Sequence, residues 1–443
     1  MSSELTTYTV EELISEGVLA PPLDGNHGGI HPKTSDFVAS GIPFIMASDM
    51  KDGIVDTKNC SFISAEQASK LRKGFSKTGD VLLSHKATIG RTALVGKIDS
   101  EYIVLTPQVT YYRVLDSKRL NNRYLKYYFD SLPFQQTLAS WAGAGSTRAY
   151  IGITAQRKLP ITLPAIKIQE AIAEMIGALD DRILLLRETN STLEAIAQAL
   201  FKSWFVDFDP VRAKQEGREP EGMDAEAAAL FPDSFEESEL GLVPKGWRVK
   251  SLDTIAEYLN GLALQKFPPD EDEWLPVIKI AQLRKGDTNG ADRASRRLKS
   301  EYIIQNGDVL FSWSGSLDVV VWCGGEGALN QHLFKVTSKN YPKWFYYFWT
   351  KHHLASFQQT AASKATTMGH IQRKHLTEAK VIVPPIESIQ AINGYFTPLL
   401  DRWITNELKA RTLTTLRDTL LPRLISGQLR LPDAEALIEE AAA

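Results

Sequence analysis

The sequence contains two similar halves in the same order, and this repeat limits the possible fold more than any other feature. The matched segments are Gly79-Asp-Val-Leu-Leu-Ser84 with Gly307-Asp-Val-Leu-Phe-Ser312, Phe134-Gln-Gln136 with Phe357-Gln-Gln359, Leu163-Pro164 with Val383-Pro384, and Asp181-Arg182 with Asp401-Arg402. A repeat of about 200 residues is too long for a solenoid unit. It predicts two complete domains of the same fold.

Each half begins with short runs of β-branched and aromatic residues bounded by turn residues, a pattern typical of strands. Examples are residues 80–84, 102–106 and 109–114. Aromatic-rich segments of helical length follow at 122–132 and 343–354. We therefore predict an α/β (α+β) fold, with globular domains at residues 1–162 and 246–383.

Both domains are followed by a long stretch in which apolar side chains recur every three or four residues. The first row is Ile168, Ile172, Met175, Leu179, Ile183, Leu186, Leu193, Ala197, Leu200 and Trp204, and the second is Ile389, Ile392, Phe396, Leu399, Trp403, Asn406, Ala410, Leu413 and Leu420. This spacing predicts coiled-coil helices within residues 163–206 and 384–427. Pro164 and Pro385 mark their starts, and Gly427 ends the second.

Each of these helices has one apolar seam, so pairing them antiparallel would bury both seams within one chain. That arrangement predicts an approximate two-fold axis between the domains, the symmetry suited to two half-sites on a duplex. At about 60 Å, each helix could serve as a ruler. Alternatively, each helix packs only on its own domain. Asn190 and Asn406 occupy core-type positions, where they either fix register or mark a solvent-facing slip.

The charge is unevenly distributed along the chain. The net charge is −3, but residues 216–240 carry −8 and residues 433–440 carry −4, so the remainder carries +9. We predict an acidic linker at 207–245 and an acidic tail at 428–443. Basic clusters occur at Lys70, Arg72, Lys73 and Lys77, at Lys86 and Arg91, at Arg293, Arg296, Arg297 and Lys299, and at Arg373, Lys374 and His375. They either attract phosphates or are solvated faces.

Composition excludes several other classes of protein. No apolar run approaches the roughly 18 residues of a membrane span, and the first residues lack a signal-peptide pattern, so we expect a cytoplasmic protein with no membrane association. Cys60 and Cys323 are the two cysteines, too few for a disulfide framework or cysteine metal cluster. We expect both to be buried.

Motifs for catalysis are missing. The sequence has no phosphate-binding loop, and Val383-Pro-Pro-Ile386 lacks the polar residue that an amino-methyltransferase motif needs before its two prolines. His27 and His31 have a metal-ligand spacing but lie in a Gly- and Pro-rich loop. We therefore predict no catalytic residue, no metal and no cofactor.

Three further segments carry a family resemblance that covers nearly the whole chain. Leu200-Phe-Lys-Ser-Trp-Phe-Val-Asp-Phe-Asp-Pro210, Leu242-Val-Pro-Lys-Gly-Trp247 and Leu420-Leu-Pro-Arg-Leu-Ile-Ser-Gly427, in this order and within a repeat, resemble the specificity subunits of type I restriction-modification enzymes. The resemblance implies that each globular domain is a target-recognition domain for half of a split, asymmetric site on double-stranded DNA. The helices would set the gap between the halves.

The same resemblance implies partners that supply the chemistry. Two modification (methyltransferase) subunits would bind the helical region, and restriction subunits would supply ATP-driven translocation and cleavage. For docking we favour the aromatic end of the first helix, Phe201, Trp204 and Phe205, for which a structural core is the alternative.

Base contacts are expected from polar and basic loop residues. The candidates are Lys86, Thr88, Arg91, Ser146, Thr147 and Arg148 in the first domain, and Trp313, Ser314, Ser316, Lys364, Thr366, Thr367 and His370 in the second. Solvated turns are the alternative for any one of them. Gln108, which aligns with Gln331, is expected to be structural.

Two other classes of function remain as alternatives. A coiled-coil scaffold without DNA specificity fits the net charge but leaves the duplicated domains unexplained. A self-contained nuclease or methyltransferase conflicts with the missing motifs.

Overall fold

The structure is a computed structural model that describes residues 5–142, 150–270, 273–363 and 369–442. The chain divides into two compact units. Unit 1 comprises Met1–Leu184 and Arg411–Ala443, and unit 2 comprises Leu185–Ala410. Each unit contains one globular repeat and a segment of both long helices. Within the described residues, no helix has the length and apolar character needed to cross a membrane.

Unit 1 is built from three mixed or antiparallel sheets. They contain, in spatial order, β1 (Thr6–Thr9) and β13 (Pro160–Leu163); β2 (Leu23–Asp24), β12 (Val109–Tyr112), β9 (Val81–Ser84), β10 (Thr92–Leu94), β6 (Ile54–Val55) and β5 (Met50–Lys51); and β3 (Phe37–Val38), β7 (Ser61–Ile63), β4 (Ile42–Ile45), β11 (Ile103–Leu105) and β8 (Phe75–Ser76). The short helices are α1 (Val10–Ser15), α2 (Ala65–Ser69), α3 (Asn122–Asp130), α4 (Leu132–Ala142) and α5 (Ile153–Gln156). Alternating strand residues such as Leu82 and Leu105 form its core.

Unit 2 repeats this plan. Its sheets contain β16 (Arg248–Ser251) and β25 (Lys380–Val383); β17 (Glu257–Asn260), β24 (Leu333–Thr337), β21 (Val309–Ser312) and β22 (Asp318–Val321); and β19 (Arg293–Ser295), β18 (Trp274–Ile278), β23 (Gly327–Leu329) and β20 (Ile303–Ile304). The helices of this repeat are α9 (Leu252–Ile255), α10 (Ile280–Lys285), α11 (Lys343–Ser363) and α12 (Arg373–Glu378). Its largest core cluster includes Trp247, Trp344 and Phe396.

Strand register confirms the internal repeat. Ser84 of β9 pairs with Val109 of β12, and the aligned Ser312 of β21 pairs with Leu333 of β24. Both units contain parallel pairing at an equivalent place, β4 with β11 in unit 1 and β18 with β23 in unit 2, and unit 1 also pairs β6 with β10 in parallel. The two globular domains therefore share the α/β fold that the sequence predicted.

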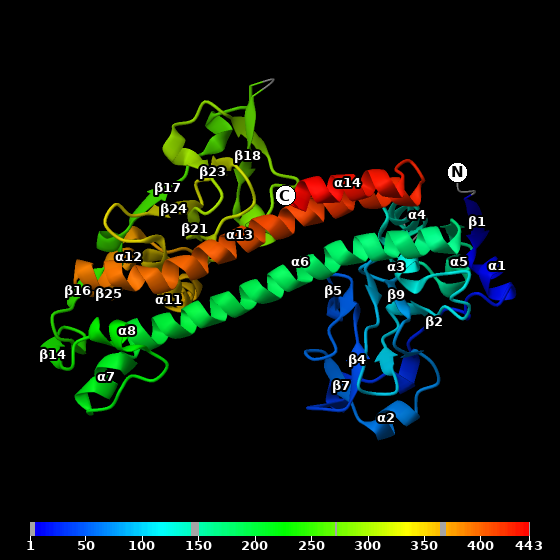
Figure 1. Cartoon of the computed structure of the whole chain (residues 1–443), viewed down its shortest axis with the longest axis horizontal. Coiled ribbons are helices and arrows are strands. Elements are labelled where there is room, and N and C mark those ends of the chain that lie inside the picture. Colours follow the sequence, from blue (N-terminus) through cyan, green and yellow to red (C-terminus); the bar gives the residue numbers. More distant parts are fainter. Residues whose placement is uncertain (1–4, 143–149, 271–272, 364–368, 443) are drawn as a thin grey trace. The chain divides into compact units, whose positions relative to one another are not determined.

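The two long helices begin and end close to the predicted positions. Helix α6 covers Ile166–Phe201 and α13 covers Ile386–Ile425 (Figure 1). Pro164 and Pro385 lie just before them. Gly427 follows α13 with a φ of 72°, a left-handed conformation that favours glycine at a helix end.

The helices pack against each other in both units. In unit 2, Asn190 of α6 faces Asn406 of α13, and Ala197 lies beside Leu400, so residue numbers run in opposite directions and the pair is antiparallel. In unit 1, Asp180 of α6 contacts Arg417 of α13. The alternative in which each helix packs only on its preceding domain is wrong, because the second half of α6 joins the core of unit 2.

The predicted acidic linker and tail contain regular secondary structure. The linker contains helices α7 (Asp209–Gln215) and α8 (Ala225–Ala229) and a hairpin of β14 (Phe235–Ser238) and β15 (Gly241–Pro244). Its apolar side chains Phe208, Val211, Phe231 and Val243 are buried in the core of unit 2. In the tail, residues 431–442 form helix α14. Apolar residues interspersed among the carboxylates explain why these acidic segments form helices and strands.

Asn190 and Asn406 form a buried polar contact within the helix seam. The Asn406 side-chain amide donates to Asn190 Oδ1 (3.0 Å), and the Asn190 amide donates to the carbonyl of Trp403 (3.0 Å). Both side chains are almost fully buried. The register-fixing interpretation of these residues therefore holds over the solvent-facing one.

We predict that Asn406→Leu lowers the free energy of unfolding by about 1–3 kcal/mol, because it leaves Asn190 Oδ1 buried without its hydrogen-bond donor. The double variant Asn190→Leu/Asn406→Leu should recover most of that loss, because both polar groups are removed together. Denaturant unfolding of both variants measures the difference. A double variant less stable than the single one would contradict the prediction.

Candidate nucleic-acid interface

Two equivalent loops follow the central strands of the two repeats. The first loop (residues 85–91) joins β9 to β10, and the second loop (residues 313–317) joins β21 to β22. Each is joined to a segment distant in sequence, because the Ile151 amide donates to the carbonyl of His85 (3.0 Å) and the Ile371 amide donates to that of Trp313 (3.0 Å). The fold thus places Ile151 beside the first loop and Ile371 beside the second.

Most of the described candidate residues are accessible. Lys86, Thr88, Arg91, Ser316 and His370 are exposed, and Trp313 is partly buried. Ser314 differs from the expectation, because it is buried and its hydroxyl hydrogen-bonds with His332 Nδ1 (3.0 Å). Its placement suits support of the loop better than contact with a base. Ser146, Thr147, Arg148, Lys364, Thr366 and Thr367 lie outside the described residues.

The shared Phe-Gln-Gln motif explains how both loops are held. Gln135 donates to the carbonyl of Gly90 in the first loop (2.9 Å), and the aligned Gln358 donates to that of Leu317 in the second (3.1 Å). Ala87 and Gly315 occupy the same loop position, with φ angles of 66° and 67°. The two loops therefore share a glutamine contact and one left-handed position, although they differ in length and in side chains.

The first loop is cationic and rests on an aromatic pair. The buried His85 ring packs beside Tyr150 with centroids 5.7 Å apart, and Lys86 Nζ lies 5.9 Å from the centre of the Tyr150 ring. His85 Nδ1 also hydrogen-bonds with the Thr110 hydroxyl (2.7 Å). Burial lowers the pKa of His85 to about 4, against the opposing effect of Asp24. The imidazole is therefore neutral at physiological pH.

A charged cluster adjoins this loop. Asp24 of β2 contacts Lys73 and His27, the latter at 2.7 Å. Burial raises the pKa of Asp24, but its hydrogen bonds to Lys73 and His27 outweigh that effect and leave the pKa below its ordinary value. Asn26 accepts a hydrogen bond from the Arg72 amide (2.9 Å), which holds the basic segment in place. Part of the predicted basic cluster at 70–77 therefore lies beside the first loop.

The second loop has a neutral, aromatic environment instead. Trp313 takes the place of His85, and its indole nitrogen donates to Asn260 Oδ1 (3.0 Å), which occupies the position of Asp24. The Trp313 and His370 rings meet edge to face with centroids 6.2 Å apart. Both repeats thus pair an imidazole ring with a larger aromatic ring. In the first repeat the imidazole (His85) is in the loop, whereas in the second the loop carries the indole (Trp313) and the imidazole (His370) comes from the distant segment.

Strand register corrects one alignment made from sequence. The His85 amide donates to the carbonyl of Gln108 (2.9 Å), and the Trp313 amide donates to that of His332 (3.4 Å). His332, not Gln331, is therefore the structural equivalent of Gln108. Sequence comparison preferred the identical glutamines and missed the loop contact of His332. Tyr150, Asp24 and Asn260 were missed because each meets its loop only through the folded sheet.

The predicted docking surface at the end of α6 is wrong, because its aromatic side chains are buried. Phe201, Trp204 and Phe205 are at most 5% exposed. Phe201 packs edge to face on Trp349 of α11, and Trp204 packs on Phe396 of α13. These aromatic side chains belong to the core of unit 2, as the alternative proposed. Cys60 also differs from its prediction, since it is only partly buried.

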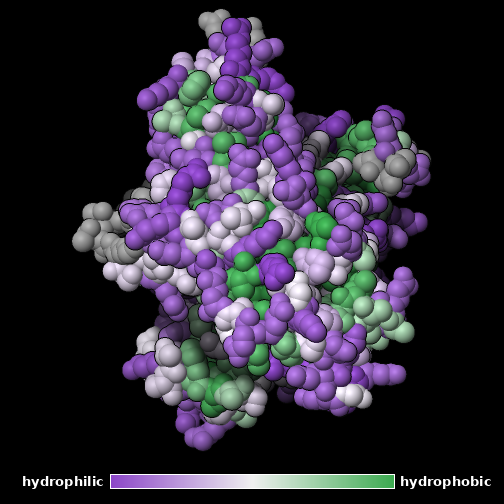
Figure 2. Space-filling view, turned by 90° about the vertical axis from the view of Figure 1, so that its left-hand side faces the viewer, coloured by the Kyte–Doolittle hydropathy of each residue, from purple (hydrophilic) through white to green (hydrophobic). Residues whose placement is uncertain are grey.

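The surface near the hairpin is mixed in character. Figure 2 shows the face on the side of α7 and β14 in Figure 1, where hydrophilic side chains predominate and hydrophobic ones form separate patches. Leu240 and Leu242 at the hairpin are 49% and 60% exposed. The apolar groups on this face are thus divided by polar ones.

The histidines considered as metal ligands have other contacts. His27 hydrogen-bonds to Asp24, and the His31 ring packs on Phe44. Across the ranges that the structure describes, three or more His, Cys, Asp or Glu side chains nowhere gather as a metal site would require.

Comparison with known proteins identifies the family of this fold. The family model for the type I restriction modification DNA specificity domain matches residues 27–195 and 244–415, one match for each repeat. Because these matches cover most of the sequence, the chain belongs to the type I restriction-modification DNA specificity family.

Individual relatives agree in name and in length. The chain is 23% identical over 421 residues to the type I restriction enzyme MjaIX specificity subunit of Methanocaldococcus jannaschii, covering 92% of this chain and 91% of the relative. It is 26% identical over 320 residues to the HindI specificity subunit of Haemophilus influenzae, covering 61% and 69%. The crystal structure of a type I S subunit from M. genitalium shares the fold, with a TM-score of 0.57, 13% identity and 96% coverage of both chains.

The buried neutral state of His85 predicts a pH-dependent stability. Histidine in an unfolded chain has a pKa of about 6.5. Between pH 6.5 and 4, His85 is therefore protonated in the unfolded chain but neutral in the folded one. Stability is therefore lost as the pH falls through this window, by up to roughly 3 kcal/mol. His85→Gln should show a shallower loss in denaturant unfolding from pH 8 to 4.5. An identical pH dependence in the two proteins would contradict this assignment.

Proposed function

We propose that this chain is a noncatalytic DNA-binding subunit that recognises a bipartite, asymmetric site. The observation that carries the proposal is the pair of equivalent loops that are held alike and differ in chemistry. The first loop places Lys86 and Arg91 at the surface, whereas the second places Ser316 there, with His370 exposed on the segment bridged to it. Basic side chains favour guanine and phosphate, and hydroxyl and imidazole groups suit other base edges. Two unlike half-sites follow from two unlike loops.

We propose further that the paired helices α6 and α13 set the unrecognised gap between the half-sites. At 36 and 40 residues, each helix is about 54–60 Å long. Two modification subunits and the restriction subunits would dock on this chain and supply methylation, translocation and cleavage. Double-stranded DNA, at the basic surface beside the first loop, would be the common ligand.

The decisive experiment is to co-express the chain with the methyltransferase encoded beside it and to map methylated positions on genomic DNA. We expect two short specified sequences separated by a gap of fixed length. Affinity of the complex should fall steeply with salt, because phosphate contacts release counterions. A continuous site, or the lack of a stable complex, would overturn the proposal. Methylation by the chain alone would instead indicate a self-contained enzyme.

Loop substitutions should relax one half-site at a time. Lys86→Ala is expected to reduce base discrimination in one half of the site by about 10–100-fold, because a good base contact contributes about 1–3 kcal/mol. Ser316→Ala should relax the other half. The matched control is Lys97→Ala, an exposed lysine beyond the opposite end of β10. If Lys86→Ala and Ser316→Ala weakened the same half-site, the assignment of one loop to each half would be wrong.

A further inference from the structure

Unit 1 contains a partly buried ion network at the junction of three helices. Asp180 of α6 contacts Arg417 of α13 (2.7 Å) and Lys126 of α3 (3.2 Å), and Lys126 also contacts Asp130 (2.9 Å). The Tyr127 hydroxyl donates to Asp180 (3.0 Å). The side chain of Lys126 is 9% exposed and that of Asp180 is 17% exposed. Groups so poorly solvated hold each other in place strongly, because removing one leaves the other's charge unpaired.

The ionisation of Asp180 fits this geometry. Burial raises the pKa of this carboxyl group, but the charges and hydrogen bonds of Lys126 and Arg417 outweigh burial and lower the pKa below its ordinary value. Asp180 is therefore a carboxylate throughout the physiological range, and the network is charged.

The network extends to the first loop. The Thr92 hydroxyl, one residue beyond that loop, hydrogen-bonds to Asp130. Asp130 ends α3, and Gln135, five residues later, donates to the Gly90 carbonyl. A continuous series of side chains, Thr92, Asp130, Lys126, Asp180 and Arg417, therefore joins the first loop to both long helices.

Among the described residues of the second repeat, no equivalent series of side chains is found. Under the 220-residue shift that relates the helices, Asp180 corresponds to Leu400 and Arg417 to Ala197. From the strand register, Thr92 corresponds to Val319, which has no polar side chain. Lys351 of α11 contacts Glu194 of α6. Because Val319 of β22 cannot hydrogen-bond through its side chain as Thr92 does, this ion pair is not linked to β22 by an equivalent contact. The glutamine contact and the backbone hydrogen bonds of the first loop are repeated in the second, whereas the Thr92 contact to Asp130 is not.

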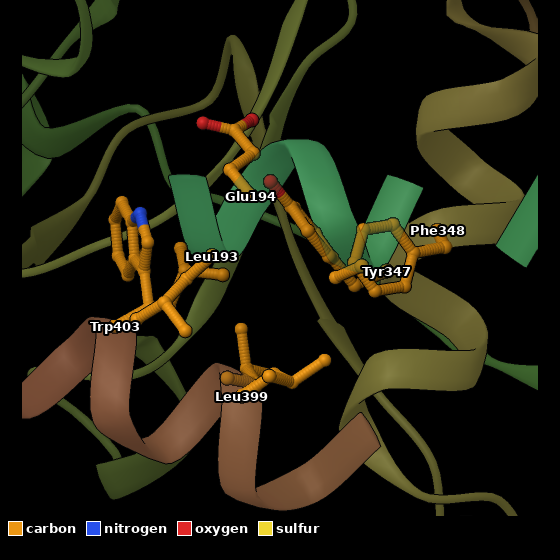
Figure 3. A pocket seen from close by; sticks show the side chains of 9 residues that line it. Leu193, Glu194, Tyr347, Phe348, Leu399 and Trp403 are labelled. Carbon is orange, nitrogen blue, oxygen red and sulfur yellow. The ribbon is translucent and has the colours of Figure 1, made fainter. Parts of the chain in front are cut away.

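A small, mainly apolar cavity occupies the equivalent junction in unit 2. Leu400 and Ala197 both line it. Figure 3 shows Leu193 of α6 beside Leu399 and Trp403 of α13, with Tyr347 and Phe348 of α11 on another side and the Glu194 carboxylate pointing away from Leu399 and Trp403. Apolar contacts around a void are less directional than an ion network, so they fix orientation less tightly.

We propose that Lys126, Asp180 and Arg417 are positioning residues that fix the first loop on the two helices, while the second loop is attached less rigidly. This inference rests on the proposed function for its consequence in DNA recognition. Because the first loop is held to the helices that set the gap, the network restricts the permitted spacer length.

The direct test is amide hydrogen exchange in the full chain, which does not depend on DNA binding. Asp180→Asn removes the charge while keeping the shape, and should accelerate exchange in residues 86–95 by roughly tenfold, with the second loop unchanged. The matched control is Asp181→Asn, which removes a neighbouring but exposed ion pair to Arg123. Arg417→Lys, which retains the positive charge, should restore slow exchange relative to Arg417→Gln. If Asp180→Asn does not fold, the comparison of exchange rates between Arg417→Lys and Arg417→Gln tests the same inference.

The second readout is spacer selection by the complex with the methyltransferase. On DNA with spacers longer or shorter by one or two base pairs, Asp180→Asn should accept spacers that the original chain rejects, with base preference at the second half-site retained. Exchange equal to that of Asp181→Asn, equal loosening of both loops, or unchanged spacer selection would overturn the inference. Failure of the proposed function gives a different result. The unsubstituted complex would then select no split site, while Asp180→Asn would still exchange faster than Asp181→Asn in the first loop.

Discussion

The burial of two apolar helix seams against each other is the constraint on which the rest of this structure depends. Neither α6 nor α13 could remain a stable single helix in water with its row of leucine, isoleucine and aromatic side chains exposed. Their pairing removes those side chains from solvent, and the contact between Asn190 and Asn406 adds a polar requirement that favours one register. Each repeat packs against part of this helix pair, so the register affects how both repeats are held.

The duplicated domains combine a common frame with different chemistry. Both loops are held in a similar way. They follow equivalent strands, accept equivalent hydrogen bonds from Gln135 and Gln358, and have a left-handed backbone at Ala87 and Gly315. The side chains on that frame differ, with His85 replaced by Trp313. Exposed residues of these loops can change without disturbing the core, since exposed loop positions contribute little to folding.

The junctions with the helices show that the repeat is not symmetric in its energetics. Unit 1 uses the Asp180 ion network where unit 2 uses Leu400 beside a small cavity. Buried charges require specific partners, whereas apolar contacts tolerate small shifts. The two halves of one chain can therefore hold similar loops with unequal rigidity, a difference that alignment of the repeats alone does not reveal.

The sequence by itself determined the repeat, the α/β class, the long helices with their proline starts and the Gly427 end, because these follow from local periodicity and turn chemistry. It also located the loops at Lys86 and Ser316. Only the tertiary structure decided which side chains are available. Phe201, Trp204 and Phe205 are core residues and Ser314 is buried, because burial depends on partners far away in the sequence. Tyr150 and the Asp180 network could not be predicted for the same reason, because contacts between distant segments leave no periodic signal along the chain.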